Sequence, residues 1–183
     1  MRAYVIVYDG FNEFEIILAN YFIKTIGEIL TVGLTNQLIT SFEGMQIQPH
    51  LTINEVNIDD VDMFIIPGGE PTELLQCNAL QQLLINLDKK QTPIAAICSA
   101  TIHLAKTHLL DHRHYTSEFN LTELVELDGA ISVPENVVTD GHIITAKPNG
   151  YVDFAIEIGK KLEIFKDQAD LDETIQFFKY FKA

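Results

Sequence analysis

The sequence has few basic residues, few cysteines and no long apolar run. Its 183 residues include 12 lysines and arginines against 26 aspartates and glutamates, a formal net charge of −14 at pH 7. Such a surface repels phosphate backbones and anionic lipids, so nucleic acid is excluded as an expected partner. No stretch reaches the ~20 apolar residues of a membrane-spanning helix, and the apolar run at residues 3–8 is too short for a signal peptide. We expect a cytoplasmic protein with no membrane partner and, because the chain ends without a DNA-binding extension, no transcription-regulator role.

Two cysteines are too few for a disulfide framework, and both are expected to stay reduced in the cytoplasm. A chain of this length buries roughly 70% of its unfolded surface, so a single domain of residues 1–183 needs no disulfide or metal to fold. Cys77 lies in a helical run and is expected to pack as a small apolar residue.

Cys98 stands where an apolar strand turns into a helix. Residues 94–97 are uncharged and apolar, as in a strand buried on both faces of a parallel sheet, and a helical stripe begins at Ile102. This pattern predicts a nucleophile elbow. A helix N-terminus lowers the pKa of a thiol, so we expect a reactive thiolate. The alternative is a buried structural cysteine.

Strands and helices alternate along the chain. This order predicts an α/β fold, with a mostly parallel sheet, helices on both faces and a small antiparallel edge from residues 38–51. The Asp-Gly turn within residues 137–145 predicts a hairpin. The other expected strands are residues 2–8, 29–34, 62–66 and 94–97, with a short one near Tyr115. The expected helices are residues 12–26, 72–87, 121–127 and one region from 149 to 181 with a break at 162–170. In the first helix, the predicted apolar side is Phe14, Ile17, Leu18, Tyr21 and Phe22.

Three turns leave the carboxyl edge of this predicted sheet, where ligands bind in such folds. They are residues 9–15, 67–71 and 98–99. Together they offer a carboxylate, a glycine pair with free N–H groups and a nucleophile, as carbonyl addition requires. Each has a structural alternative: Asn12 and Glu15 as a capping box, and Gly68-Gly69 as a tight turn.

Four histidines crowd into residues 103–114, but their spacings of five, four and two do not keep one helical face. No second cysteine or carboxylate cluster completes a tetrahedral set, so we expect no metal and no other cofactor. His103, His108, His112 and His114 are expected at the surface.

The blocks around these turns resemble the DJ-1/PfpI family, also called ThiJ/PfpI, in their usual order. They are residues 8–15, 64–69, 95–98, 109–111, 115–117 and 138–146. The resemblance implies a flavodoxin-like α/β sandwich and a homodimer. It also implies that Cys98 is the nucleophile and Glu15 its protonated carboxylic acid partner, with the amides of Gly69 and Ser99 as oxyanion pocket and Gly68 lining it.

A desolvated carboxyl with a raised pKa can stay protonated and donate a hydrogen bond to sulfur, so a glutamic acid suits that place. Two positions depart from the family pattern. Ala100 replaces a usual glycine and crowds the pocket floor, and Glu118 stands where many relatives carry a histidine. Glu118 either lies in the pocket or is an exposed residue, and it cannot act as a basic imidazole.

We therefore expect a cysteine-dependent enzyme acting on small carbonyl or acyl compounds, as a glyoxalase or deglycase-like hydrolase does. The alternative is a non-enzymatic redox or stress sensor, or a chaperone-like protein, in which Cys98 is oxidised. Glutamine amidotransferase activity, a label such proteins often carry, is not expected. That chemistry resembles a Cys-His-Glu triad with a late histidine, and no histidine follows His142.

Overall fold

Short apolar strands form the centre of one seven-stranded sheet in the computed structural model, which describes residues 1–182. The strands are β1 (Arg2–Ile6), β2 (Glu28–Gly33), β5 (Leu51–Thr52), β6 (Met63–Ile66), β7 (Ile94–Ile97), β10 (Val137–Asp140) and β11 (Ile143–Ala146). Their order is β10-β11-β7-β6-β1-β2-β5, and every neighbouring pair is parallel except β10 with β11. The strands β6, β7 and β11 are buried along their whole length, as expected for parallel strands covered on both faces.

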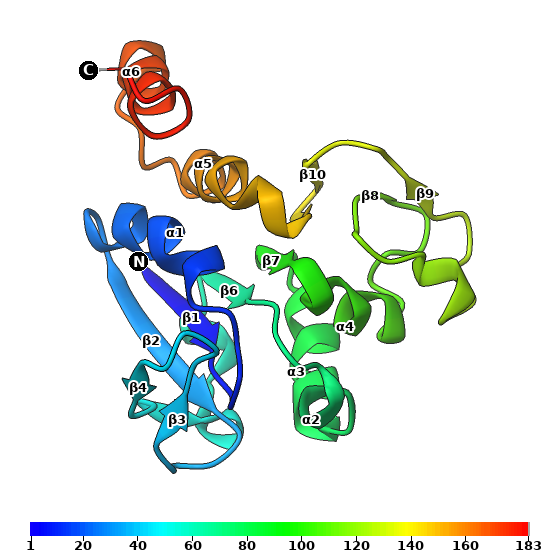
Figure 1. Ribbon diagram of the computed structural model, residues 1–183. Coiled ribbons are helices and arrows are strands. Elements are labelled where there is room, and N and C mark those ends of the chain that lie inside the picture. The colour runs from blue at the N-terminus through cyan, green and yellow to red at the C-terminus, as the bar shows by residue number, and fades with distance from the viewer. Residues whose placement is uncertain (183) are drawn as a thin grey trace.

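Helices cover both faces of the sheet, as the alternation predicted. They are α1 (Phe14–Lys24), α2 (Thr72–Leu75), α3 (Asn78–Lys89), α4 (Thr101–Lys106), α5 (Tyr151–Lys161) and α6 (Gln168–Phe178). In Figure 1, α1 and α5 lie side by side on one face, α3 and α4 cover the other, and α6 lies outside α5. Among residues 1–182, no helix is both long enough and apolar enough to cross a membrane.

Within residues 1–182, antiparallel strands pair at two places, and an isolated antiparallel bridge joins Phe11 to Gly69. The predicted hairpin of residues 137–145 is present as β10 and β11. The predicted excursion near residues 38–51 forms a separate two-stranded sheet of β3 (Ile39–Thr40) and β4 (Gln46–Ile47), while β5 joins the main sheet. A further parallel pair consists of β8 (His114–Tyr115) and β9 (Ile131–Ser132).

Two helix predictions were wrong. The helix expected at residues 72–87 is divided into α2 and α3, because Cys77 takes an extended conformation at the start of α3. Cys77 still packs against the core while partly buried. The helix expected at residues 121–127 is only a short 3-10 turn at Leu121–Glu123.

The buried face of α1 also differs from the prediction. The residues that α1 buries are Glu15, Ile16, Ala19, Phe22 and Ile23. Of the predicted apolar side only Phe22 is fully buried, whereas Phe14, Ile17 and Tyr21 are 46%, 51% and 60% exposed. Because α1 is apolar nearly all round, periodicity alone does not identify the side that faces the sheet.

The parallel register brings three turns to one edge. Val5 pairs with Ile65, and Ile66 with Ala96, so β1, β6 and β7 end at neighbouring positions. The segments that follow these strands therefore meet at the carboxyl edge, where a ligand site is expected in an open α/β sheet.

Candidate functional site

Cys98 directly follows β7 and opens a 3-10 turn that leads into α4. Its φ is +59°, in the left-handed region that a residue with a side chain rarely adopts. Such a conformation is stabilised only by its surroundings and is frequent at functional sites. The side chain is partly buried and in the thiol form, with no disulfide. The predicted elbow geometry is therefore present.

Glu15 is buried at the same edge, with only 1% of the residue exposed. Its Oε2 accepts the backbone N–H of Gly68 at 2.7 Å, and its Oε1 accepts the side-chain amide of Asn12 at 3.1 Å. Neither bond caps the helix. The carboxylate of Glu43 accepts the first N–H groups of α1, those of Glu13 and Phe14, at 3.0 and 3.1 Å. The capping-box interpretation of Asn12 and Glu15 was therefore wrong.

Gly68 lies where the thiol and the carboxyl converge. A Cβ added at Gly68 would lie 2.6 Å from Cys98 Cβ, 3.0 Å from Cys98 Sγ and 2.7 Å from Glu15 Oε2. Heavy atoms do not approach that closely, so only glycine leaves room for both side chains. The tight-turn interpretation of Gly68 is incomplete, because glycine, which has no side chain, also leaves space for the Cys98 thiol and the Glu15 carboxyl.

Burial dominates the electrostatics of this pair. It raises the pKa of the Glu15 carboxyl, against hydrogen bonds from Gly68 and Asn12 that lower it. Burial, with the charge of Glu15 adding to it, also raises the pKa of the Cys98 thiol to about 12. The N–H of Ser99 acts in the opposite direction on the thiol. The two acidic groups therefore cannot both be ionised near neutral pH.

The expectation that the pKa of Cys98 lies below that of a free thiol was wrong. It rested on the positive end of a following helix, but α4 has only six residues and begins three positions beyond the cysteine. A helix this short adds little positive potential, and burial next to a carboxyl outweighs it.

Ser99 and Gly69 contact each other across the site. The N–H of Gly69 donates to Ser99 Oγ at 3.0 Å, and the Ser99 hydroxyl donates to the Gly69 carbonyl at 2.8 Å. Because the N–H of Gly68 binds Glu15, neither glycine N–H is free in this structure, contrary to the expectation for the pair.

Glu118 is exposed, yet it lies near enough for its charge to raise the pKa of Cys98, as the smallest of the causes. Hydrogen bonds connect its neighbour to the elbow: Ser117 Oγ is 2.8 Å from Thr101 Oγ1, which donates to the Cys98 carbonyl at 2.9 Å. Glu118 is therefore an exposed residue whose charge reaches the Cys98 thiol.

The histidines lie apart from this constellation, and none is among the groups that shift the pKa of Cys98. His108, His112 and His114 are partly or fully exposed, but His103 is only 3% exposed, contrary to the surface prediction. The cause is that α4 is buried from Thr101 to Ala105. Within the described part of the chain, no three histidine, cysteine, aspartate or glutamate side chains gather in a metal-binding arrangement.

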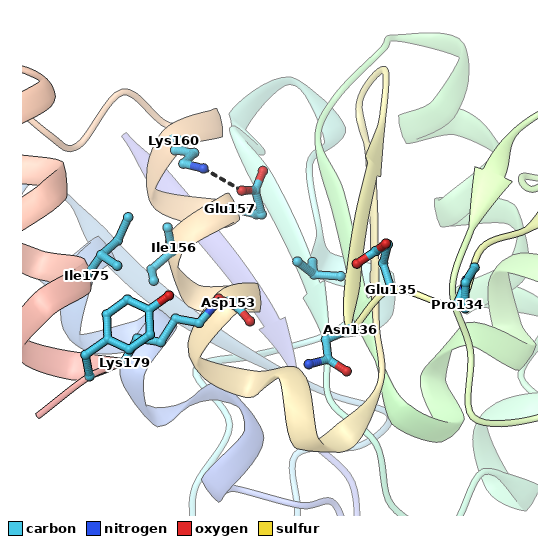
Figure 2. A pocket seen from close by; sticks show the side chains of 11 residues that line it. Pro134, Glu135, Asn136, Asp153, Ile156, Glu157, Lys160, Ile175 and Lys179 are labelled. Atoms are coloured by element: carbon cyan, nitrogen blue, oxygen red, sulfur yellow. Dashed lines mark hydrogen bonds and ion pairs between the residues drawn. The ribbon is translucent and has the colours of Figure 1, made fainter.

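Figure 2 shows a cavity of about 580 Å³ away from Cys98, between residues 134–137, α5 and α6. Its two lysines are already paired, Lys160 with Glu157 at 2.7 Å and Lys179 with Asp153 at 2.6 Å. It contains no cysteine and none of the residues that the sequence singled out. Cys98, outside this cavity, is therefore the candidate nucleophile.

Sequence reasoning missed the roles of three supporting residues. Asn12 contacts the carboxyl of Glu15, and the Tyr8 hydroxyl donates to the Pro67 carbonyl at 3.1 Å beneath the glycine turn. Burial raises the pKa of Tyr8, and the charges of Glu15 and Cys98 add to this. Glu43, far away in sequence, holds the start of α1. The position of Asn12 three residues before Glu15 was the only local indication of any of these contacts.

Comparison with known proteins identifies the family. A family model described as the DJ-1/PfpI family matches residues 1–161. The chain belongs to the DJ-1/PfpI family. One relative, the Uncharacterized protease YoaZ of Bacillus subtilis, is 30% identical over 149 residues, which cover 75% of this chain and 68% of that protein. Another, Deglycase TK1284 of Thermococcus kodakarensis, is 27% identical over 155 residues, 82% of this chain and 92% of that protein.

Solved structures share the fold. The DJ-1 superfamily protein Atu0886 from Agrobacterium tumefaciens has a TM-score of 0.86 to this chain at 22% identity, and the match covers 98% of this chain and 99% of that one. The Drosophila melanogaster DJ-1beta structure has a TM-score of 0.81 at 26% identity, covering 100% of this chain and 98% of that one. The predicted flavodoxin-like α/β sandwich is therefore confirmed.

Proposed function

We propose that the protein is a cysteine-dependent enzyme that converts small carbonyl compounds, dicarbonyls above all, by addition of Cys98 to the carbonyl carbon. The observation that carries the proposal is that Cys98 Sγ and Glu15 Oε2 both lie beside Gly68, in the space that any larger residue at position 68 would fill. The family membership and the deglycase names of relatives such as TK1284 support the same class of substrate.

Glu15 supplies the proton chemistry in this proposal. Its carboxyl is close enough to the Cys98 thiol for its charge to raise the pKa of the thiol, and the pair keeps at least one proton near neutral pH. As sulfur bonds to the carbonyl carbon, the thiol proton passes to Glu15, and the carbonyl π electrons move onto oxygen. Protonated Glu15 then returns its proton to the sulfur as the bond from Cys98 Sγ to carbon breaks and the product leaves. No histidine is needed for these steps.

The developing oxyanion is assigned to the amides of Gly69 and Ser99. Backbone N–H groups that point at such an oxygen stabilise it as its charge forms. The Ser99 N–H is close enough to the Cys98 sulfur to lower the pKa of the thiol, so it is near any atom bonded to sulfur. Gly69 follows Gly68 in the turn after β6, and its N–H faces the Ser99 side chain from that turn.

The decisive experiment compares the wild type with Cys98→Ser on a panel of dicarbonyl and acyl compounds, by product formation and intact mass. We expect catalytic consumption of a dicarbonyl by the wild type and none by the variant. Consumption by both would exclude a cysteine nucleophile. Modification of Cys98 without turnover would instead support the redox or stress sensor.

We also propose that the protein forms a homodimer through the exposed apolar face of α1, made by Phe14, Ile17 and Tyr21. Monomeric proteins rarely expose large contiguous apolar patches. The expected result is a dimer mass in sedimentation analysis, shifted to monomer by Ile17→Glu. A monomeric wild type at micromolar concentration would contradict this proposal.

A further inference from the structure

One side chain holds both backbone polar groups of Gly69. The Ser99 hydroxyl accepts from the Gly69 N–H at 3.0 Å and donates to the Gly69 carbonyl at 2.8 Å, and Ser99 is only 5% exposed. A side chain that bonds a single distant residue at its donor and at its acceptor fixes the orientation of that residue. Here the two residues are 30 positions apart, on the turns that follow β6 and β7.

Gly69 is a residue whose orientation needs fixing. Its φ of +137° is accessible to glycine alone, and a Cβ would lie 2.5 Å from the Gly10 carbonyl oxygen and 2.7 Å from Phe11 Cα. Glycine also has the most conformational freedom to lose. Ser99 directly follows Cys98, which is itself at a φ of +59°. The Ser99 hydroxyl therefore joins the turn that contains the nucleophile to the backbone of Gly69 in the turn after β6.

We propose that Ser99 is a positioning residue for carbonyl addition, and that its hydroxyl is the resting acceptor of a Gly69 N–H which the substrate oxyanion takes over. This inference rests on the proposed function. When the bond from Cys98 Sγ to the carbonyl carbon forms, the π pair moves to oxygen and the thiol proton passes to Glu15. The oxyanion then replaces Ser99 Oγ as acceptor, because a charged acceptor forms the stronger hydrogen bond. The Ser99 O–H remains on the Gly69 carbonyl, and serine loses no proton.

The test uses two reactions of the same sulfur. Alkylation by iodoacetamide bonds sulfur to carbon and expels iodide without forming an oxyanion. Reversible addition to methylglyoxal does form one, and the adduct is measured by the protection it gives Cys98 against iodoacetamide, with no need for turnover. Both are measured in wild type, Ser99→Ala and Ser99→Thr, with Ser132→Ala as a control at an exposed serine on β9.

Without the hydroxyl that holds the Gly69 carbonyl, the Gly69 N–H is no longer kept aimed at the oxyanion. We therefore expect Ser99→Ala to weaken the methylglyoxal adduct about tenfold, the order of losing that hydrogen bond to a charged group, and to leave the rate and pH profile of alkylation within about twofold. Ser99→Thr keeps the hydroxyl and restores most of the adduct stability. An equal loss in both reactions would reduce Ser99 to a structural residue, and no loss in either would also overturn the proposal. A wild type that forms the adduct without releasing product would contradict the proposed function and leave the role of Ser99 standing.

Discussion

The backbone N–H of Gly68 donates to Glu15 Oε2 at 2.7 Å, joining the turn after β6 to the first turn of α1 across 53 positions of sequence. The bond holds the carboxyl beside Gly68, where the side chain of Cys98 also lies. It lowers the pKa of Glu15, but burial raises that pKa by more. The carboxyl is thus fixed in position while its affinity for a proton stays high, which is the combination required of a group that accepts and returns one.

Replacement of Glu15 tests this coupling. Glu15→Gln removes the carboxylate charge that raises the pKa of Cys98, so that pKa should fall from about 12 by at least about one unit. Glu15→Leu also removes the charge, but leucine provides no hydrogen-bond donor to the sulfur. The pKa of Cys98 should therefore fall less in Glu15→Leu than in Glu15→Gln. The measurement is the pH dependence of iodoacetamide alkylation in a Cys77→Ser background. Three superimposed profiles would show that Glu15 does not act on the thiol.

The same two variants should lose catalysis. Neither glutamine nor leucine can accept the thiol proton, and a positioned acid or base typically contributes ~10²–10⁴-fold in rate. We expect dicarbonyl consumption to fall by about this factor in both, although the thiol of Glu15→Gln is easier to ionise. A Glu15→Gln enzyme with wild-type kcat would assign the proton transfer to another group.

The charge of Glu118 should affect the pKa of the Cys98 thiol. That charge raises the pKa of Cys98 as the smallest of the causes, so Glu118→Gln should lower that pKa by less than Glu15→Gln does. Glu118→His should lower it as well and add a base, raising dicarbonyl turnover. Glu173→Gln, an exposed glutamate on α6, is the matched control. Identical alkylation profiles for the wild type and both Glu118 variants would place Glu118 outside the site.

Gly68→Ala should remove activity through space alone. The new Cβ would overlap Cys98 Cβ, whose distance is 2.6 Å, so either the thiol or the turn has to move. We expect a loss of at least about 100-fold in kcat/KM, as for an ångström-scale misplacement of reacting groups. Gly44→Ala is the control: its φ is +93° but no atom lies within 4 Å of the added Cβ, so it bears backbone strain without a clash. Equal activity of the two variants would rule out a spatial role for Gly68.

His103 should make the protein sensitive to mild acid. Burial lowers its pKa from 6.5 to about 4, so the unfolded chain binds a proton below pH 6.5 that the folded protein does not bind until about pH 4. The stabilising contribution is complete above pH 6.5 and is lost as the pH falls toward 4, at a total of roughly 3 kcal/mol. Urea midpoints at pH 7 and pH 5 should converge in His103→Leu. They should stay apart in His112→Leu, whose histidine side chain is 73% exposed.

The strands and the site turns could be predicted because their patterns are local. Residues 94–98 contain the whole transition from buried strand to cysteine, and the structure has it there. The face of α1 could not be predicted, because Phe14, Ile17 and Tyr21 are as apolar as the residues that it buries, and packing on the sheet decided between them. The direction of the Cys98 pKa shift was missed for a similar reason, since burial depends on distant segments.

The bonds that complete the site were also beyond sequence reasoning. Ser99 meets Gly69 only because the register of β6 against β7 places their two turns side by side. Asn12 was interpreted as a cap, since its spacing from Glu15 suits both roles. Local sequence identifies which residue types stand at the edge, and the parallel pairing decides which of them touch.

The lack of a side chain at Gly68 couples the evolution of positions 68 and 98. A methyl group there would occupy the volume of the nucleophile, so an ancestor with a working cysteine could not pass through alanine at 68 and remain active. A descendant that had lost the thiol would no longer be held to glycine for that reason. Among duplicated copies of such a gene, the residue at position 68 should therefore record whether the chemistry at position 98 was kept.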